Sequence, residues 1–165
     1  MSARTLQVWG PADFLPNSGT FGDPGIDGQF RPFLAIANAE TFDTPQFIAP
    51  QTTTTPLTLI VTYRMTSATA NAIKFRCAVE AISDGDSTDT DAASSFDSNN
   101  DSSADVTVPG TAGFIDQLSI TLTNNDTIAA ADLLRLRFTR ITPTGTEASG
   151  DMEILAIELR DNGGA

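Results

Sequence analysis

Residues 57–83, LTLIVTYRMTSATANAIKFRCAVEAIS, decide the fold. Two runs in this stretch, 57–65 and 73–81, alternate inward and outward positions and are joined by a short polar turn. A period of two is typical of strands with one buried face. The predicted inward side chains are Leu57, Leu59, Val61, Tyr63 and Met65 in the first run, and Ile73, Phe75, Cys77, Val79 and Ala81 in the second. We predict that the two runs form the central antiparallel pair of a β-sandwich.

Shorter extended segments follow the same pattern along the chain. Strands are predicted at 6–9, 33–38, 44–49, 105–109, 115–124, 132–142 and 152–160, with a turn at 40–43 and one helical turn at 128–134. Short strands separated by Gly and Pro turns are typical of an all-β sandwich or barrel. We predict an all-β, antiparallel β-sandwich, a jelly roll of about eight strands. The alternative is an immunoglobulin-like sandwich, although the chain lacks the Cys–Trp–Cys spacing of such domains.

The first 32 residues are dense in glycine and proline, which makes a long helix there improbable. We therefore divide the chain into an extended arm (1–32), a jelly-roll β-sandwich (33–161) and a flexible tail (162–165). Trp9, Phe14 and Phe21 are the aromatic anchors of the arm. The arm either packs across its own sandwich or reaches a neighbouring subunit. Exposed aromatic patches are rare on monomers, and this favours packing on its own domain.

Charge and composition narrow the possible partners. The chain has 165 residues, 21 acidic against nine basic residues and a net charge of −12, with no histidine. Such an acidic surface repels nucleic acids and anionic membranes, so neither is an expected partner. No apolar run approaches the length of a membrane span, and the first residues do not form a signal peptide. We expect synthesis in a cytoplasm and no disulfide framework, since Cys77 is the only cysteine.

Residues 84–105, DGDSTDTDAASSFDSNNDSSAD, form an Asp-rich segment without a basic residue. One interpretation is a calcium loop, because hard cations bind clustered oxygen ligands. Asp97, Asn99 and Asp101 match the first ligand positions of an EF-hand loop, but Ser102 stands where that loop needs Gly and Val108 where it needs Glu. The favoured interpretation is a solvated surface connection, with residues 92–96 touching the sheet.

The sequence shows no catalytic constellation. Without histidine, neither a Ser–His–Asp nor a Cys–His arrangement can form, and His/Cys zinc sites are excluded. Cys77 falls on an inward strand position and is predicted to be inert core. Arg135, Arg137 and Arg140 form the only basic stripe. We expect these arginines to pair with acidic side chains on neighbouring strands or across a subunit contact.

The order of motifs resembles small proteins from the structural gene clusters of tailed bacteriophages. The motifs are an early WGP, then LTLIVTYRMTSA, AIKFRCAVEAIS, GDSTDTDAASSF, PGTAG, LSITLTNNDTIAAADLLRLRFTR and GDMEILAIELRD, and the similarity covers about residues 57–161. The resemblance implies a virion component with a jelly-roll or related β-sandwich domain, and it transfers no catalytic residue or cofactor. Such proteins often act as capsid decoration (cement) proteins, commonly as trimers, while others belong to tails, baseplates or fibres.

Three hypotheses about function follow. The favoured one is a non-enzymatic, homotrimeric decoration protein on the virion surface, made in the host cytoplasm, which binds the major capsid protein and stabilises the head. Trp9, Phe14 and Phe21 would be its partner-binding residues, since aromatic residues dominate interface energetics. The alternative is a tail or fibre component that binds a receptor or carbohydrate through residues 84–105. The third, an enzyme acting on polysaccharide, needs a carboxylate pair that the sequence does not single out.

Overall fold

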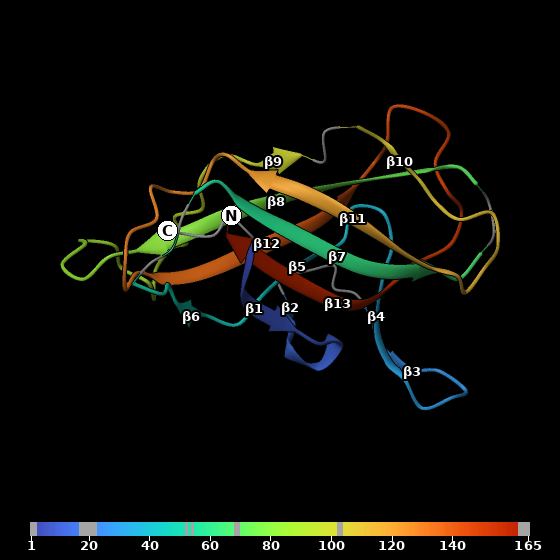
Figure 1. Ribbon diagram of the computed structural model, residues 1–165, viewed down its shortest axis with the longest axis horizontal. Helices are drawn as coiled ribbons and strands as arrows, with labels where there is room; N and C mark the ends of the chain where they lie inside the picture. The colour runs from blue at the N-terminus through green and yellow to red at the C-terminus, as the bar shows by residue number, and fades with distance from the viewer. Residues whose placement is uncertain are drawn as a thin grey trace.

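The computed structural model describes residues 3–16, 23–51, 53, 55–67, 70–101 and 104–161. These residues form two facing antiparallel sheets (Figure 1). The first sheet contains β1 (Arg4–Trp9), β3 (Asp23–Ile26), β4 (Pro32–Ile36), β7 (Leu57–Met65), β11 (Ile115–Leu122) and β13 (Met152–Asp161). The second contains β2 (Leu15–Pro16), β5 (Thr41–Asp43), β6 (Phe47–Ile48), β8 (Ala72–Ile82), β9 (Asn100–Asp101), β10 (Val106–Thr107) and β12 (Leu133–Ile141). The predicted all-β sandwich is confirmed.

The topology places β13 and β12 at the centres of their sheets. The first sheet has the order β11–β7–β13–β4–β3, and β1 also pairs with β13. The second has the order β10–β8–β12–β5–β2, with β6 on β12 and β9 on β8. The helical content of the described residues is one 3₁₀ turn, η1 (Pro11–Asp13). Among these residues, no helix has the length and hydrophobicity needed to cross a membrane.

The predicted pairing of the two long runs is wrong. Strand β7 pairs with β11 and β13, whereas β8 pairs with β12, β9 and β10, so the two runs lie in opposite sheets. The segment between them therefore crosses from one sheet to the other. Both arrangements bury alternate residues in the same core, and hence the period of two does not distinguish a hairpin from a crossing.

The core lies between the sheets and contains the predicted inward residues. All ten inward positions of the two long runs are at most 9% exposed. Phe138 joins the rings of the second sheet, with its centroid 4.9 Å from that of Phe75 and 5.0 Å from that of Phe42. Each such apolar side chain contributes roughly 1.5–3 kcal/mol through burial. The sandwich is thus held by the alternation that the sequence displays.

Three local predictions fail for identifiable reasons. The turn predicted at 40–43 is strand β5, which pairs with β12, and the actual turn precedes it at 37–40. The helical turn predicted at 128–134 is absent, because this stretch forms turns and the start of β12. A bulge between Ile154 and Ala156 shifts the register of β13. Ile154 is therefore buried and Leu155 is not, although regular alternation with the buried Ile157 and Leu159 would place Leu155 inward.

The described part of residues 1–32 belongs to both sheets. Strand β1 pairs with β13, β3 pairs with β4, and β2 pairs with β5. Trp9 is 2% and Phe14 6% exposed, and they contact Phe47 and Phe42 with centroids 5.5 and 4.6 Å apart. The described part of the arm thus packs on its own domain, as the favoured alternative predicted. The β3–β4 hairpin extends away from the rest of the sandwich (Figure 1).

Candidate functional site

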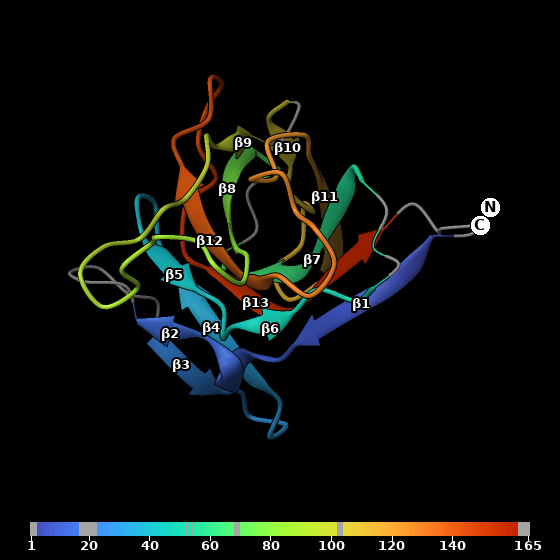
Figure 2. The same cartoon turned by 90° about the vertical axis from the view of Figure 1, so that its left-hand side faces the viewer.

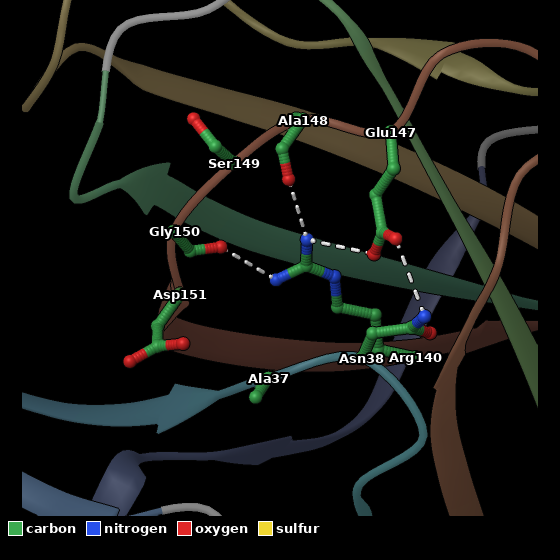
Figure 3. Close-up of a pocket in the computed structure, with 8 residues that line it drawn as sticks. All are labelled: Ala37, Asn38, Arg140, Glu147, Ala148, Ser149, Gly150 and Asp151. Carbon is green, nitrogen blue, oxygen red and sulfur yellow. Dashed lines mark hydrogen bonds and ion pairs between the residues drawn. The ribbon is translucent and has the colours of Figure 1, made fainter.

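A polar pocket of about 330 Å³ lies at one end of the sandwich, the right-hand end in Figure 1. Three segments that are distant in the sequence line it: the turn after β4, the C-terminal end of strand β12, and the loop before β13. Its lining residues are Ala37, Asn38, Arg140, Glu147, Ala148, Ser149, Gly150 and Asp151 (Figure 3). We call it the Arg140 pocket, because Arg140 holds its parts together.

Arg140 occupies an inward position of β12. Leu134, Leu136 and Phe138 are buried at alternate positions, and Arg140 continues the series with 2% of its surface exposed. The core ends at this point, so the guanidinium meets the backbone of the chain segments that leave the sheets. A buried guanidinium requires hydrogen-bond acceptors on all sides to offset its desolvation. Burial lowers the pKa of this group, while the carboxylates of Glu147, Asp151 and Glu40 raise it.

The guanidinium ties strand β4 to the loop before β13. Its Nη1 donates to the carbonyl oxygens of Ile36, at 3.1 Å, and Gly150, at 3.0 Å. Its Nη2 donates to the carbonyl of Ala148, at 3.0 Å, and to Glu147 Oε1, at 3.4 Å. Figure 3 shows Glu147 and the carbonyl groups of Ala148 and Gly150 around the guanidinium. One side chain thus fixes the geometry of the pocket wall.

The loop itself is held by backbone contacts to β8 and to the end of β7. Ala72 accepts a hydrogen bond from the N–H of Ala148, at 2.8 Å. The hydroxyl of Thr66 accepts one from the N–H of Asp151, at 3.0 Å. Gly150 has φ of +85°, and a Cβ there would lie 2.7 Å from Thr66 Oγ1, so only glycine fits this turn. The pocket is therefore preformed by its supports.

The pocket contains unsatisfied polar groups. Among the described residues, Asn38 Oδ1 and Arg140 Nε are the buried side-chain polar atoms without a hydrogen-bond partner, and both residues line this pocket. The amide nitrogen of Asn38 is occupied, since it donates to Thr142 Oγ1 at 2.9 Å and to Glu147 Oε2 at 3.3 Å. Native proteins satisfy nearly all buried polar atoms, and exceptions point to a function or a bound molecule.

The predicted basic stripe divides between the two faces of β12. Arg135 and Arg137 point outward and bind acids, with Arg137 Nε 2.9 Å from Asp43 Oδ1 and Arg135 Nη2 2.6 Å from Glu80 Oε2. The expected pairing is confirmed for these two. Grouping Arg140 with them was wrong, because residue 140 has the parity of Phe138 and faces inward. Extending the alternation by one step would have identified it.

The first part of the Asp-rich segment, residues 84–96, lies at the opposite end of the sandwich, on the left in Figure 1 and toward the viewer in Figure 2. The predicted contact with the sheet is made by Phe96, whose ring centroid is 4.1 Å from Arg137 Cζ and 4.8 Å from Arg135 Cζ. Within the described residues, no group of three or more acidic, His or Cys side chains is placed to hold a metal ion. The calcium alternative therefore gains no support from the described part of this segment.

The residues predicted to bind a partner do not line the pocket where the structure describes them. Trp9 and Phe14 are in the core, and Phe21 lies outside the described residues, so their role in binding a partner stays a prediction. Cys77 is fully buried as predicted, and burial raises the pKa of its thiol. Among the described residues, the exposed aromatics are instead Phe30, 88% exposed, and Phe114, 61% exposed.

Comparison with known proteins supports the fold assignment. No protein-family model matches the chain, and no curated protein sequence matches it. Among solved structures, the xylan-binding module CBM15 superposes with a TM-score of 0.54 at 10% identity over 99% of each chain. A family 6 carbohydrate-binding module gives 0.53 at 11% identity over 96% of this chain and 95% of that one. CsCBM6-3 from Clostridium stercorarium, in complex with cellobiose, gives 0.50 at 13% identity over 92% and 90%. The chain therefore has the jelly-roll β-sandwich fold of these carbohydrate-binding modules.

Proposed function

We propose that the protein is a non-enzymatic carbohydrate-binding module and that the Arg140 pocket is its ligand site. The observation that carries the proposal is a preformed pocket whose lining includes the polar side chains Asn38, Glu147 and Ser149. Amide and hydroxyl groups donate and accept hydrogen bonds, and a carboxylate accepts them. A sugar hydroxyl can do both, and it is therefore a suitable partner for such a wall.

Further groups of the pocket are available to a ligand. The Asp151 carboxylate and the Ser149 hydroxyl are exposed at its rim, and Figure 3 draws neither with a partner. A volume of about 330 Å³ is at the small end of the roughly 300–1,000 Å³ range of ligand pockets, which suits one or two sugar rings. The fold shared with carbohydrate-binding modules agrees with this proposal, although fold alone does not determine function.

Titration calorimetry with a panel of soluble neutral, amino and acidic oligosaccharides tests this proposal. We expect saturable binding of at least one class, and we expect Ser149→Trp to abolish it by filling the mouth of the pocket. The matched control is Ser94→Trp, which places the same ring on an exposed position of the Asp-rich segment and should leave binding intact. Absence of binding to every class, or binding that survives Ser149→Trp, would refute the proposed site.

A second candidate function is the decoration of a phage head. The β3–β4 hairpin carries Ile26, 69% exposed, and Phe30, 88% exposed. Beside it lies an apolar pocket of about 310 Å³, lined by Pro11, Ala12, Pro24, Gly25, Ile26, Pro32 and Phe33. Exposed apolar groups in one region favour contact with another protein. In this proposal a homotrimer binds the major capsid protein at the virion surface, with the hairpin in the role expected of Trp9 and Phe14.

Co-sedimentation with purified phage heads distinguishes this second candidate. Decoration predicts saturable binding to heads that is lost in Phe30→Asp and retained in the control Phe114→Asp. Immunolabelling of intact virions should then mark the head regularly. Label on the tail alone would exclude decoration and would agree with a tail or fibre component that binds carbohydrate.

A further inference from the structure

Most hydrogen-bond donors in the wall of the Arg140 pocket already bind groups of the protein, whereas acceptors remain available. Four hydrogen bonds from the Arg140 guanidinium and two from the Asn38 amide end on groups of the protein itself. The carboxylate of Asp151, which lines the pocket and is exposed, remains available as an acceptor. The ligand that complements this wall therefore carries several donors.

Negative charge is in excess around the pocket. The carboxylates of Glu40, Glu147 and Asp151 all act on the single guanidinium of Arg140. Only Glu147 is paired with it, at 3.4 Å. Asp151 is exposed and forms no side-chain hydrogen bond or ion pair with any described residue. A cationic group beside Asp151 is attracted, whereas an acidic sugar is repelled, within the screening distance of about 8 Å at physiological salt.

A second group at the rim separates an amino sugar from a simple amine. The Ser149 hydroxyl lines the pocket and is exposed, and it can both donate and accept a hydrogen bond. An ammonium group such as that of a lysine side chain has three donors and no acceptor, so it cannot accept from Ser149. An amino sugar has an ammonium group for Asp151 and hydroxyl groups for Ser149, and it therefore complements both.

We propose that the Arg140 pocket binds amino sugars with a free ammonium group in preference to neutral or acidic sugars. This inference rests on the proposed carbohydrate-binding function and names the class of ligand at the same site. Specificity then arises from one exposed carboxylate at the rim of the pocket, while the buried arginine fixes the shape of the wall.

Titration calorimetry at pH 5.5 with four trisaccharides tests the preference. The probes are the trimer of glucosamine, its fully N-acetylated counterpart, cellotriose and trigalacturonic acid. We expect the glucosamine trimer to bind about fivefold more tightly than the two neutral trimers, as one exposed ion pair allows, and trigalacturonic acid to bind most weakly. The advantage should disappear at 1 M NaCl, where the screening length is about 3 Å.

Two variants separate the pocket from the general acidity of the protein. Asp151→Asn should remove the advantage of the glucosamine trimer, so that this trimer and cellotriose bind the variant with similar affinity. Asp91→Asn, which removes an equal charge from an exposed position at the other end of the sandwich, should preserve the advantage. An advantage that survives Asp151→Asn, or that is lost equally in Asp91→Asn, would overturn the inference.

The outcomes also separate this inference from the proposed function. Equal affinity for the glucosamine trimer and cellotriose, with both lost in Ser149→Trp, would keep carbohydrate binding and overturn the amino-sugar preference. Tighter binding of trigalacturonic acid would overturn the preference as well. Failure of all four trimers to bind would remove both proposals.

Discussion

At one end of the sandwich a buried cation binds carbonyl groups, and at the other end a buried carboxylate and a buried amide bind backbone N–H and carbonyl groups and an arginine. Arg140 binds three carbonyl oxygens and Glu147. At the opposite end Glu80, 2% exposed, accepts from the N–H of Ser95 at 2.6 Å and from Arg135 Nε at 2.8 Å. Asn100, 5% exposed, bonds the carbonyl of Cys77 and both the N–H and the carbonyl of Asn124.

The two ends differ in how completely their polar groups are paired. The Glu80 end satisfies its buried side chains and covers the arginines with Phe96. The Arg140 end leaves two buried polar atoms unpaired beside a pocket. Complete pairing is typical of buried polar groups, whereas a buried unpaired atom is an exception that an ordered water, strain or a function can explain. The Asp-rich segment has the most carboxylate and hydroxyl groups that could bind a ligand, yet it belongs to the Glu80 end, which we call the closed end because its buried side chains are paired.

The largest expected effect is the loss of the buried cation. Arg140→Met keeps most of the side-chain volume but leaves three carbonyl groups and Glu147 without their donor. We expect the free energy of unfolding to fall by about 3–5 kcal/mol, measured by urea denaturation. The control Arg76→Met breaks an exposed pair with Asp101 and should cost about 0–1 kcal/mol. Equal costs for the two variants would show that Arg140 does not hold its end of the sandwich.

A smaller effect is expected at the other end. Glu80→Ala leaves the N–H of Ser95 and the guanidinium of Arg135 without their acceptor, which should cost about 2–3 kcal/mol. Hydrogen exchange should report faster exchange of the Ser95 amide, with the amides of 147–151 unchanged. The exposed control Asp91→Ala should stay within about 0.5 kcal/mol of the original protein. Faster exchange at both ends would mean that they are one cooperative unit.

Phe96→Ala tests the aromatic cover of the closed end. The substitution removes contacts with Arg135 and Arg137, each worth about 0.5–1 kcal/mol, so stability should fall by about 1–2 kcal/mol. Phe114→Ala at a 61% exposed position is the matched control, with an expected change within about 0.5 kcal/mol. If Phe96→Ala costs no more than this control, the ring contributes nothing to closure.

The smallest effect is a local response to acid at the closed end. The N–H groups of Asp126 and Ser98 donate to Asp97 and hold the pKa of its carboxyl below the ordinary value of 3.8. Because the folded-state pKa is lowered, this contribution to stability is present above about pH 4 and is lost as the pH falls through the folded value. Exchange of the Asp126 amide should therefore accelerate below pH 4, after correction for intrinsic exchange. Asp97→Asn should remove this pH dependence, and its persistence in the variant would assign it to another group.

The sequence predicts which side chains are buried better than it predicts which strands pair. Alternation identified the inward residues of both long runs, because the pleat alone decides which face a side chain takes. It could not show that β7 and β8 lie in opposite sheets, since both choices bury the same residues. The bulge in β13 was also invisible, because an extra residue changes the register without changing composition.

The candidate site was largely beyond the sequence. Its residues come from positions 37–38, 140 and 147–151, which no motif connects. The available signal was Arg140, a cation at an inward position of an otherwise apolar face. The sequence gives no such signal for Asn38, because whether its amide oxygen has a hydrogen-bond partner depends on the residues that the fold places around it. Trp9 and Phe14, two of the aromatic residues that suggested docking, are in the core, because a large apolar ring is more often buried than functional.

The position of β13 has a consequence for how the protein folds during synthesis. This strand lies between β7 on one side and β4 and β1 on the other, so the first sheet is incomplete until residues 152–161 are made. About 90 residues separate the end of β7 from the start of β13. At ribosomal rates of about 5–20 residues per second, the edge of β7 that pairs with β13 stays unpaired for roughly 5–20 seconds. Folding therefore follows synthesis of the chain's last strand, and the nascent protein spends that interval exposed to aggregation through its own edges.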